Sequence, residues 1–149
     1  MLTRIASLSI LTTVLIQCLP AQAQSCIPLT IDGRDSNRVT NTISPPGTLV
    51  SGDNWDTNWL IPAEKSFRRF FLTFIPRDSA EYDVEVNLVY KDNTREQFYY
   101  QDSLHLITGQ NLPVLIYPSS GQVPSQVSLV VGALQAIGST YSASVLGCE

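Results

Sequence analysis

Two tryptophans set among acidic side chains form the most distinctive chemical grouping in this sequence. Trp55 and Trp59 lie four positions apart, and the polar groups around them that a sugar site would use are Asp53, Asn54, Asp56 and Asn58. On a β-strand this spacing places both rings on one face, about 13 Å apart. Exposed rings would form a platform for stacking on sugar rings, and the carboxylates would bind sugar hydroxyls. Buried rings would instead be anchors of the core, as most large aromatic side chains are.

Carboxylates offer a second kind of chemistry. Two of them about 5–10 Å apart can cleave a glycosidic bond, and the candidates for such a pair are Asp53, Asp56, Glu81 and Asp83. Glu81, Asp83 and Glu85 would share one strand face, where they could also hold Ca²⁺. A solvated strand face balanced by cross-strand arginines would look the same in sequence. A small carboxylate-dependent hydrolase is therefore the weakest of three functional hypotheses.

Other catalytic and metal chemistry has little support. His105 is the single histidine, and no G-x-S-x-G turn marks a serine nucleophile. Zinc sites need three or four ligands, and neither of the oxygen-rich loops, residues 32–37 and 52–56, has the spacing of a calcium-binding loop. No glycine-rich phosphate loop is present. We therefore predict no catalytic residue, no metal and no cofactor.

The elements that must position these residues begin after an export signal. Residues 1–23 combine an early Arg4, an apolar run and Ala21-Gln22-Ala23, the pattern of a cleaved signal peptide. The apolar run is shorter than the roughly 20 residues that cross a bilayer. We expect a single domain at 24–149, secreted or periplasmic, with no membrane span after cleavage. The lack of any N-x-Ser/Thr acceptor favours a bacterial setting.

Two cysteines remain in that domain, Cys26 and Cys148, near its two ends. An even number of cysteines in an exported chain predicts a disulfide. Closing so long a loop stabilises the fold by about 4–5 kcal/mol in the chain-entropy model. Acidic residues outnumber basic ones by 13 to 9, without a basic patch, so nucleic acid is not an expected partner.

Short apolar runs between glycine, proline and asparagine turns predict an antiparallel β-sandwich of about seven to nine strands. The clearest strand is 82–90, which alternates apolar and polar residues. Residues 67–75 are apolar on both faces, which predicts a central strand covered on both sides or a second face that meets a partner. A longer, bulged loop after Tyr90 would set Phe98 opposite Leu88 and Tyr100 opposite Val86.

Together these observations favour an exported, non-catalytic β-sandwich that binds an envelope or extracellular protein, or a glycan. The alternative is a structural or assembly component of the cell envelope, which would use an exposed strand edge or the second apolar face of residues 67–75. The sequence does not decide between these functions, because fold class alone does not specify a ligand.

Overall fold

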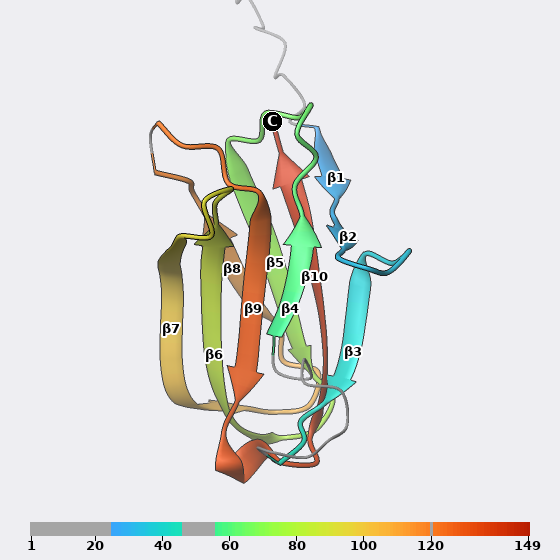
Figure 1. Cartoon of the computed structure of the whole chain (residues 1–149). Helices are drawn as coiled ribbons and strands as arrows, with labels where there is room; N and C mark the ends of the chain where they lie inside the picture. The colour runs from blue at the N-terminus through green and yellow to red at the C-terminus, as the bar shows by residue number, and fades with distance from the viewer. Residues whose placement is uncertain (1–24, 46–55, 120) are drawn as a thin grey trace, which may run out of the picture.

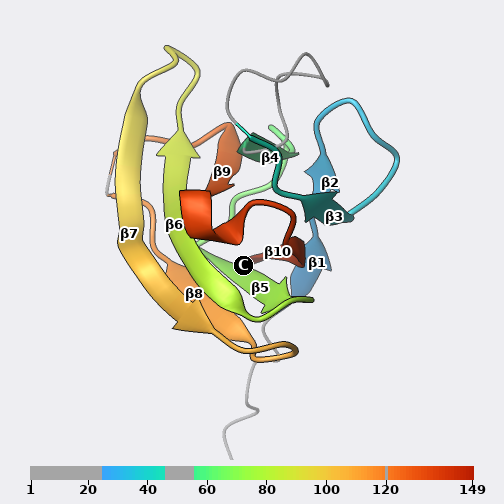
Figure 2. The same cartoon turned by 90° about the horizontal axis from the view of Figure 1, so that it is seen from below.

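The computed structural model describes residues 25–45, 56–119 and 121–149. In this part of the chain two antiparallel sheets pack face to face (Figure 1 and Figure 2), and the only helical element is a single 3-10 turn, η1. The predicted antiparallel β-sandwich is therefore confirmed. The predicted signal peptide lies outside the described residues.

One sheet, here called sheet A, is organised around β10. The strand order is β1-β10-β5-β8, and β3 pairs with β10 beyond the end of β1. Its strands are β1 (Cys26–Pro28), β3 (Arg38–Thr42), β5 (Arg69–Pro76), β8 (Leu112–Ile116) and β10 (Thr140–Cys148).

The other sheet, here called sheet B, has the order β2-β4-β9-β6-β7. Its strands are β2 (Thr30–Ile31), β4 (Asp56–Leu60), β6 (Ala80–Val89), β7 (Arg95–Leu106) and β9 (Gln126–Gly132), and η1 (Leu134–Ala136) follows β9. Since β2 pairs only with the last two residues of β4, the first part of β4 has a free edge on the side that faces β3.

The core lies between the sheets and follows the two-residue period of their strands. On β6, Tyr82, Val84, Val86 and Leu88 are fully buried, as the alternation in the sequence predicts. The largest other fully buried side chains are Trp59, Tyr141, Phe70, Phe74, Leu29, Ile43, Leu72 and Ile116. Burying each such side chain contributes about 1.5–3 kcal/mol, which makes this interior the main source of stability.

Strand β5 is central, between β10 and β8, but only one of its faces is covered. Phe71, on its outer face, is 37% exposed, so the prediction of cover on both sides is wrong. Phe67 precedes the strand and instead closes one end of the core. Its ring packs edge-on against the Phe70 ring, with the two ring centroids 5.7 Å apart. The same ring occupies the space that a side chain at Gly147 would need, because a Cβ there would lie 2.9 Å from the Phe67 ring.

The β6–β7 hairpin has the longer, bulged connection that the sequence favours, but the predicted partners are wrong. The turn is closed by the Tyr90 amide, which donates to the Thr94 carbonyl. Leu88 then pairs with Glu96, and a bulge at Phe98 brings Tyr99 opposite Val86. The bulge reverses the faces, so Phe98 and Tyr100 point outward and the half-buried Tyr99 packs against the core.

The predicted disulfide is confirmed, and it joins two residues that pair directly across β1 and β10. Cys26 and Cys148 are 122 positions apart in sequence, with their Cα atoms 4.1 Å apart. In Figure 1 β1 and the end of β10 lie side by side near the label C. The bond therefore fixes the first described strand of the sandwich to its last.

Candidate functional site

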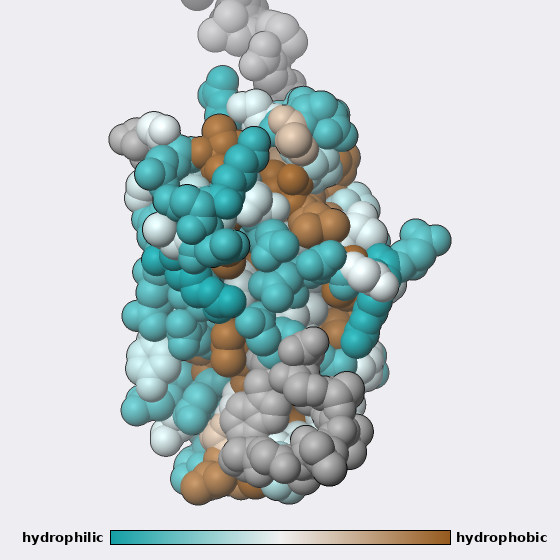
Figure 3. Space-filling model, viewed as in Figure 1, coloured by the Kyte–Doolittle hydropathy of each residue, from teal (hydrophilic) through white to brown (hydrophobic). Residues whose placement is uncertain are grey.

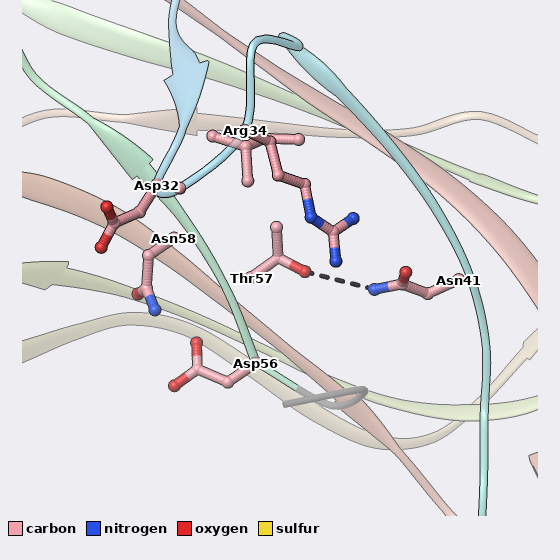
Figure 4. A pocket seen from close by; sticks show the side chains of 8 residues that line it. Asp32, Arg34, Asn41, Asp56, Thr57 and Asn58 are labelled. Carbon is pink, nitrogen blue, oxygen red and sulfur yellow. Dashed lines mark hydrogen bonds between the residues drawn. The ribbon is translucent and has the colours of Figure 1, made fainter. Parts of the chain in front are cut away.

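A polar pocket of about 290 Å³ opens between the two sheets, where the free edge of β4 faces β3. Its walls come from the turn after β2, from β3 and from the first part of β4 (Figure 4). The lining residues are Ile31, Asp32, Gly33, Arg34, Asn41, Asp56, Thr57 and Asn58. A volume near 300 Å³ is at the lower end of the range for ligand pockets, about 300–1,000 Å³, which suits one small ring.

Backbone hydrogen bonds hold the turn after β2 against β4. The Asp32 amide donates to the Asn58 carbonyl at 2.9 Å, and the Arg34 amide donates to the Ile31 carbonyl at 3.1 Å. Gly33 has a φ of 72°, the left-handed conformation that glycine adopts without a steric penalty. The turn therefore carries Asp32 and Arg34 to the mouth of the pocket as part of a fixed structure.

The side chains in the pocket combine both signs of charge with neutral donors and acceptors. Figure 4 shows the Arg34 guanidinium extending toward Thr57 and Asn41, with Asp32, Asn58 and Asp56 along the other side. Asn41 on sheet A donates to the Thr57 hydroxyl on sheet B at 3.5 Å. Amides, a hydroxyl and carboxylates that converge in this way can bind several hydroxyl groups of one ligand.

Asp56 is held at the pocket rim by bonds to neighbouring strands. Its Oδ1 accepts a hydrogen bond from the Ser128 hydroxyl at 2.9 Å, and its Oδ2 lies 3.5 Å from Nη2 of Arg95. The hydrogen bond from Ser128 holds the carboxylate in place, and the longer contact with Arg95 adds little to it.

Two buried polar atoms at this site have no hydrogen-bond partner among the described residues. They are Oδ1 of Asn58 and the hydroxyl of Tyr141. Tyr141 is fully buried on β10, and burial raises the pKa of its hydroxyl, against the opposing effect of the nearby Asn41 and Thr57 side chains. Those two side chains line the pocket, so the Tyr141 hydroxyl lies behind the lining and not in it. An unpaired buried polar group costs about 1–3 kcal/mol.

The sequence-based site prediction meets the structure only in part. Asp56 lines the pocket, whereas Asp53 and Trp55 lie outside the described residues. Trp59 is fully buried, and its ring N–H donates to the Asn37 carbonyl at 3.0 Å. Trp59 is therefore a core anchor, which was the alternative to an exposed sugar-stacking ring, and it has no exposed face that a sugar could contact.

Several pocket residues were not predicted as ligand-binding from the sequence. The turn that carries Asp32 and Arg34 had been noticed only as an oxygen-rich loop. The remaining additions to the lining are Asn41 and Thr57, with Tyr141 behind them, whereas Asn58 was among the polar groups named beside the tryptophans. Nothing in the sequence near Asn41 or Tyr141 connects them with Asp56, because the pairing of β3 with β10 and the stacking of the two sheets bring them together.

The acidic row on β6 does not form a site with Asp56. Asp83 accepts a hydrogen bond from the Ser103 amide at 2.8 Å, and Glu85 accepts one from the Asn87 side chain at 2.9 Å. Glu81 pairs across the hairpin with His105, and both are exposed. These residues bind within their own hairpin, as a solvated strand face does.

Within the described residues, no three histidine, cysteine or carboxylate side chains group in a way that could hold a metal ion. The same part of the chain has no helix that is long and apolar enough to cross a membrane.

Comparison with known proteins gives only a distant structural likeness. No protein-family model and no curated protein matches the sequence. Among solved structures, a mutant of a family 29 carbohydrate-binding module is similar, with a TM-score of 0.45 and 7% sequence identity. That likeness covers 85% of this chain and 74% of the other.

Proposed function

We propose that this protein is an exported, non-catalytic binding module whose pocket between β3 and β4 takes a neutral sugar. The observation that carries the proposal is a buried oxygen without a hydrogen-bond partner on a residue that lines the pocket, Asn58 Oδ1. A ligand hydroxyl can donate to this oxygen. Binding would then remove a cost that the free protein carries.

The charges in the pocket support a neutral ligand. Asp32 and Asp56 bring two negative charges and Arg34 brings one positive charge. An anion would meet the two carboxylates, and a cation would meet the guanidinium, so either would bind against a like charge. A polyhydroxylated neutral ring can use all three groups through hydrogen bonds, together with the amides of Asn41 and Asn58.

The non-catalytic assignment rests on the way the carboxylates are used. Glycoside hydrolysis needs one carboxyl group free to give a proton and a second free to activate water or attack the sugar. Asp56 accepts a hydrogen bond from Ser128, and two other predicted candidates, Glu81 and Asp83, lie on β6 outside the pocket lining. We therefore treat the pocket as a place of recognition.

The test is a glycan array of neutral gluco-, manno-, galacto-, xylo- and chito-sugars, followed by calorimetry with the best binder. We expect Asn58→Ala to weaken binding at least tenfold while it leaves the melting temperature nearly unchanged, because Asn58 Oδ1 has no partner to lose. Asn111→Ala, an exposed asparagine outside the pocket, is the matched control. No binding to any sugar, or equal binding by Asn58→Ala and the unmodified protein, would overturn the proposal.

An assembly role is the second candidate, and a surface on sheet A favours it. Pairing of β1, β10, β5 and β8 aligns four apolar residues across the outer face, Pro28, Leu146, Phe71 and Leu115. All four are exposed, and rows of this kind mark interaction surfaces when they are extensive. Self-association of the purified protein in sedimentation, reversed by Phe71→Asp, would favour this role over sugar binding.

A further inference from the structure

The outer face of sheet B continues from the pocket as three rows of side chains that cross β4, β9, β6 and β7. The strand registers define these rows. In the order β4, β9, β6, β7, the first row is Asp56, Val130, Glu85 and Tyr100. The middle row is Asn58, Ser128, Asn87 and Gln97. The third row is Leu60, Gln126, Val89 and Arg95. Figure 3 shows that this face is mostly hydrophilic. The first and middle rows both begin at residues that line the pocket.

The middle row is polar throughout, yet two of its members are hidden from solvent. Ser128 is 0% exposed and Asn87 is 2% exposed, although both point away from the core. Polar side chains on an outer sheet face are ordinarily accessible to water. Some other part of the protein must therefore lie over them.

Arg95 is the side chain that crosses this row. It starts on β7 in the third row, and its guanidinium reaches Asp56, which is on β4 in the first row. The direct path between these residues runs diagonally over β6 and β9, where Asn87 and Ser128 lie. We call this crossing side chain the Arg95 strap.

The strap is held weakly, and the residues beneath it do not depend on it. Its ion pair with Asp56 is 3.5 Å long, and the Arg95 side chain is 49% exposed. Exposed ion pairs of this kind contribute at most about 1 kcal/mol. Ser128 is bonded to Asp56 at 2.9 Å and Asn87 to Glu85 at 2.9 Å, so these polar groups stay in place when the strap leaves.

Tyr100 marks the far end of the same face. It stands on β7 straight across from Asp56 and is 56% exposed. Three strand spacings separate the two residues, about 14 Å, which is more than one sugar ring spans. An exposed aromatic ring at this distance offers a stacking surface for a later unit of a ligand that begins in the pocket.

We propose that the ligand is an oligosaccharide that starts in the pocket, displaces the Arg95 strap and continues over the middle row to stack on Tyr100. This inference rests on the proposed function and adds the length and direction of the ligand. The strap covers the polar row in the free protein, and the sugar chain replaces it with hydroxyl groups. Binding of longer chains therefore carries the small cost of breaking the Arg95–Asp56 pair.

The experiment is calorimetry of the full protein with the monosaccharide and the tetrasaccharide of the sugar series that binds best on the array. We expect the tetrasaccharide to bind at least tenfold more tightly than the monosaccharide. Tyr100→Ala should abolish this gain and leave monosaccharide binding unchanged. Tyr117→Ala, which removes a tyrosine of similar exposure (52%) after β8, should leave both affinities unchanged.

The strap itself is tested with Arg95→Ala, which should raise the ratio of tetrasaccharide affinity to monosaccharide affinity a few-fold. Arg68→Ala, an exposed arginine that precedes β5, is the matched control. If the monosaccharide binds but chain length has no effect, or if Arg95→Ala does not raise this ratio of affinities, this inference fails and the pocket proposal stands. If neither sugar binds, both fail.

Discussion

Tyr82 and Tyr141 are both fully buried between the sheets, but only the Tyr82 hydroxyl has a hydrogen-bond partner among the described residues. The Tyr82 hydroxyl donates to the Asp78 carbonyl at 2.6 Å. The Tyr141 hydroxyl, on the side of β3 and β4, has no partner among the described residues. The same contrast occurs within β4, where the Trp59 ring N–H is bonded to Asn37 and the neighbouring Asn58 Oδ1 is unpaired.

This difference separates a region whose buried polar groups are paired from one that leaves two of them unpaired. Folded proteins pair nearly all of their buried polar groups, because each unpaired group costs free energy. The interior around Trp59 and Tyr82 follows this rule. The pocket region departs from it at Asn58 Oδ1 and, on the interior side, at the Tyr141 hydroxyl, and the proposed ligand would supply a partner to the first.

The largest effect should come from breaking the paired region at Trp59. Trp59→Ala removes a fully buried ring and its hydrogen bond, and we expect it to lower the free energy of unfolding by about 3–5 kcal/mol. Urea denaturation followed by circular dichroism measures this change. Leu134→Ala, at a residue that is 72% exposed, should stay within about 0.5 kcal/mol of the unmodified protein. A small effect at Trp59 would remove the distinction between core and pocket.

A matched pair of substitutions then compares the two tyrosines directly. Tyr82→Phe leaves the Asp78 carbonyl without its donor and should destabilise the protein by about 1 kcal/mol. Tyr141→Phe removes an unpaired hydroxyl, so it should leave stability unchanged or raise it by up to about 1 kcal/mol. Thermal denaturation of the two variants gives both measurements. Equal losses of stability in both variants would show that the two hydroxyls are equally well bonded.

The smallest effect concerns a well-paired polar cluster at the β6–β7 hairpin. Glu96 accepts short hydrogen bonds from Ser119 and Tyr90, and these lower its pKa below the ordinary value of 4.5. Burial and the Glu96 carboxylate raise the pKa of Tyr90 to about 12, so its hydroxyl stays a donor across the neutral range.

A carboxyl group with a lowered pKa stabilises the fold above its unfolded pKa, and this stabilisation is lost as the pH falls through its folded pKa. We therefore expect Glu96→Gln to be less stable than the unmodified protein at pH 7 and to lose less stability between pH 5 and pH 3. Urea titrations at the three pH values measure the difference, with Glu81→Gln as the control at an exposed position. Identical acid sensitivity in both variants would contradict the role of the cluster.

Much of the fold could be predicted because its signals are local. The alternation on β6 gives its buried face directly, and turn residues mark where strands end. The disulfide follows from the number of cysteines and the expected compartment. The hairpin shows the limit of such reasoning, because one bulge at Phe98 moved Tyr99 inward and turned its neighbours outward. Apolar pattern alone does not locate a bulge on an edge strand.

The candidate site could be predicted only at Asp56 and Asn58. The sequence by itself determined a cysteine-bridged, alternating, sheet-forming chain, since hydrophobic period and cysteine number are properties of short segments. The tertiary structure alone decided that Trp59 enters the core and that Asn41 and Asn58 line one pocket, with Tyr141 behind Asn41. These residues belong to three strands in two sheets, and only the registers and the stacking of the sheets bring them within reach of one ligand.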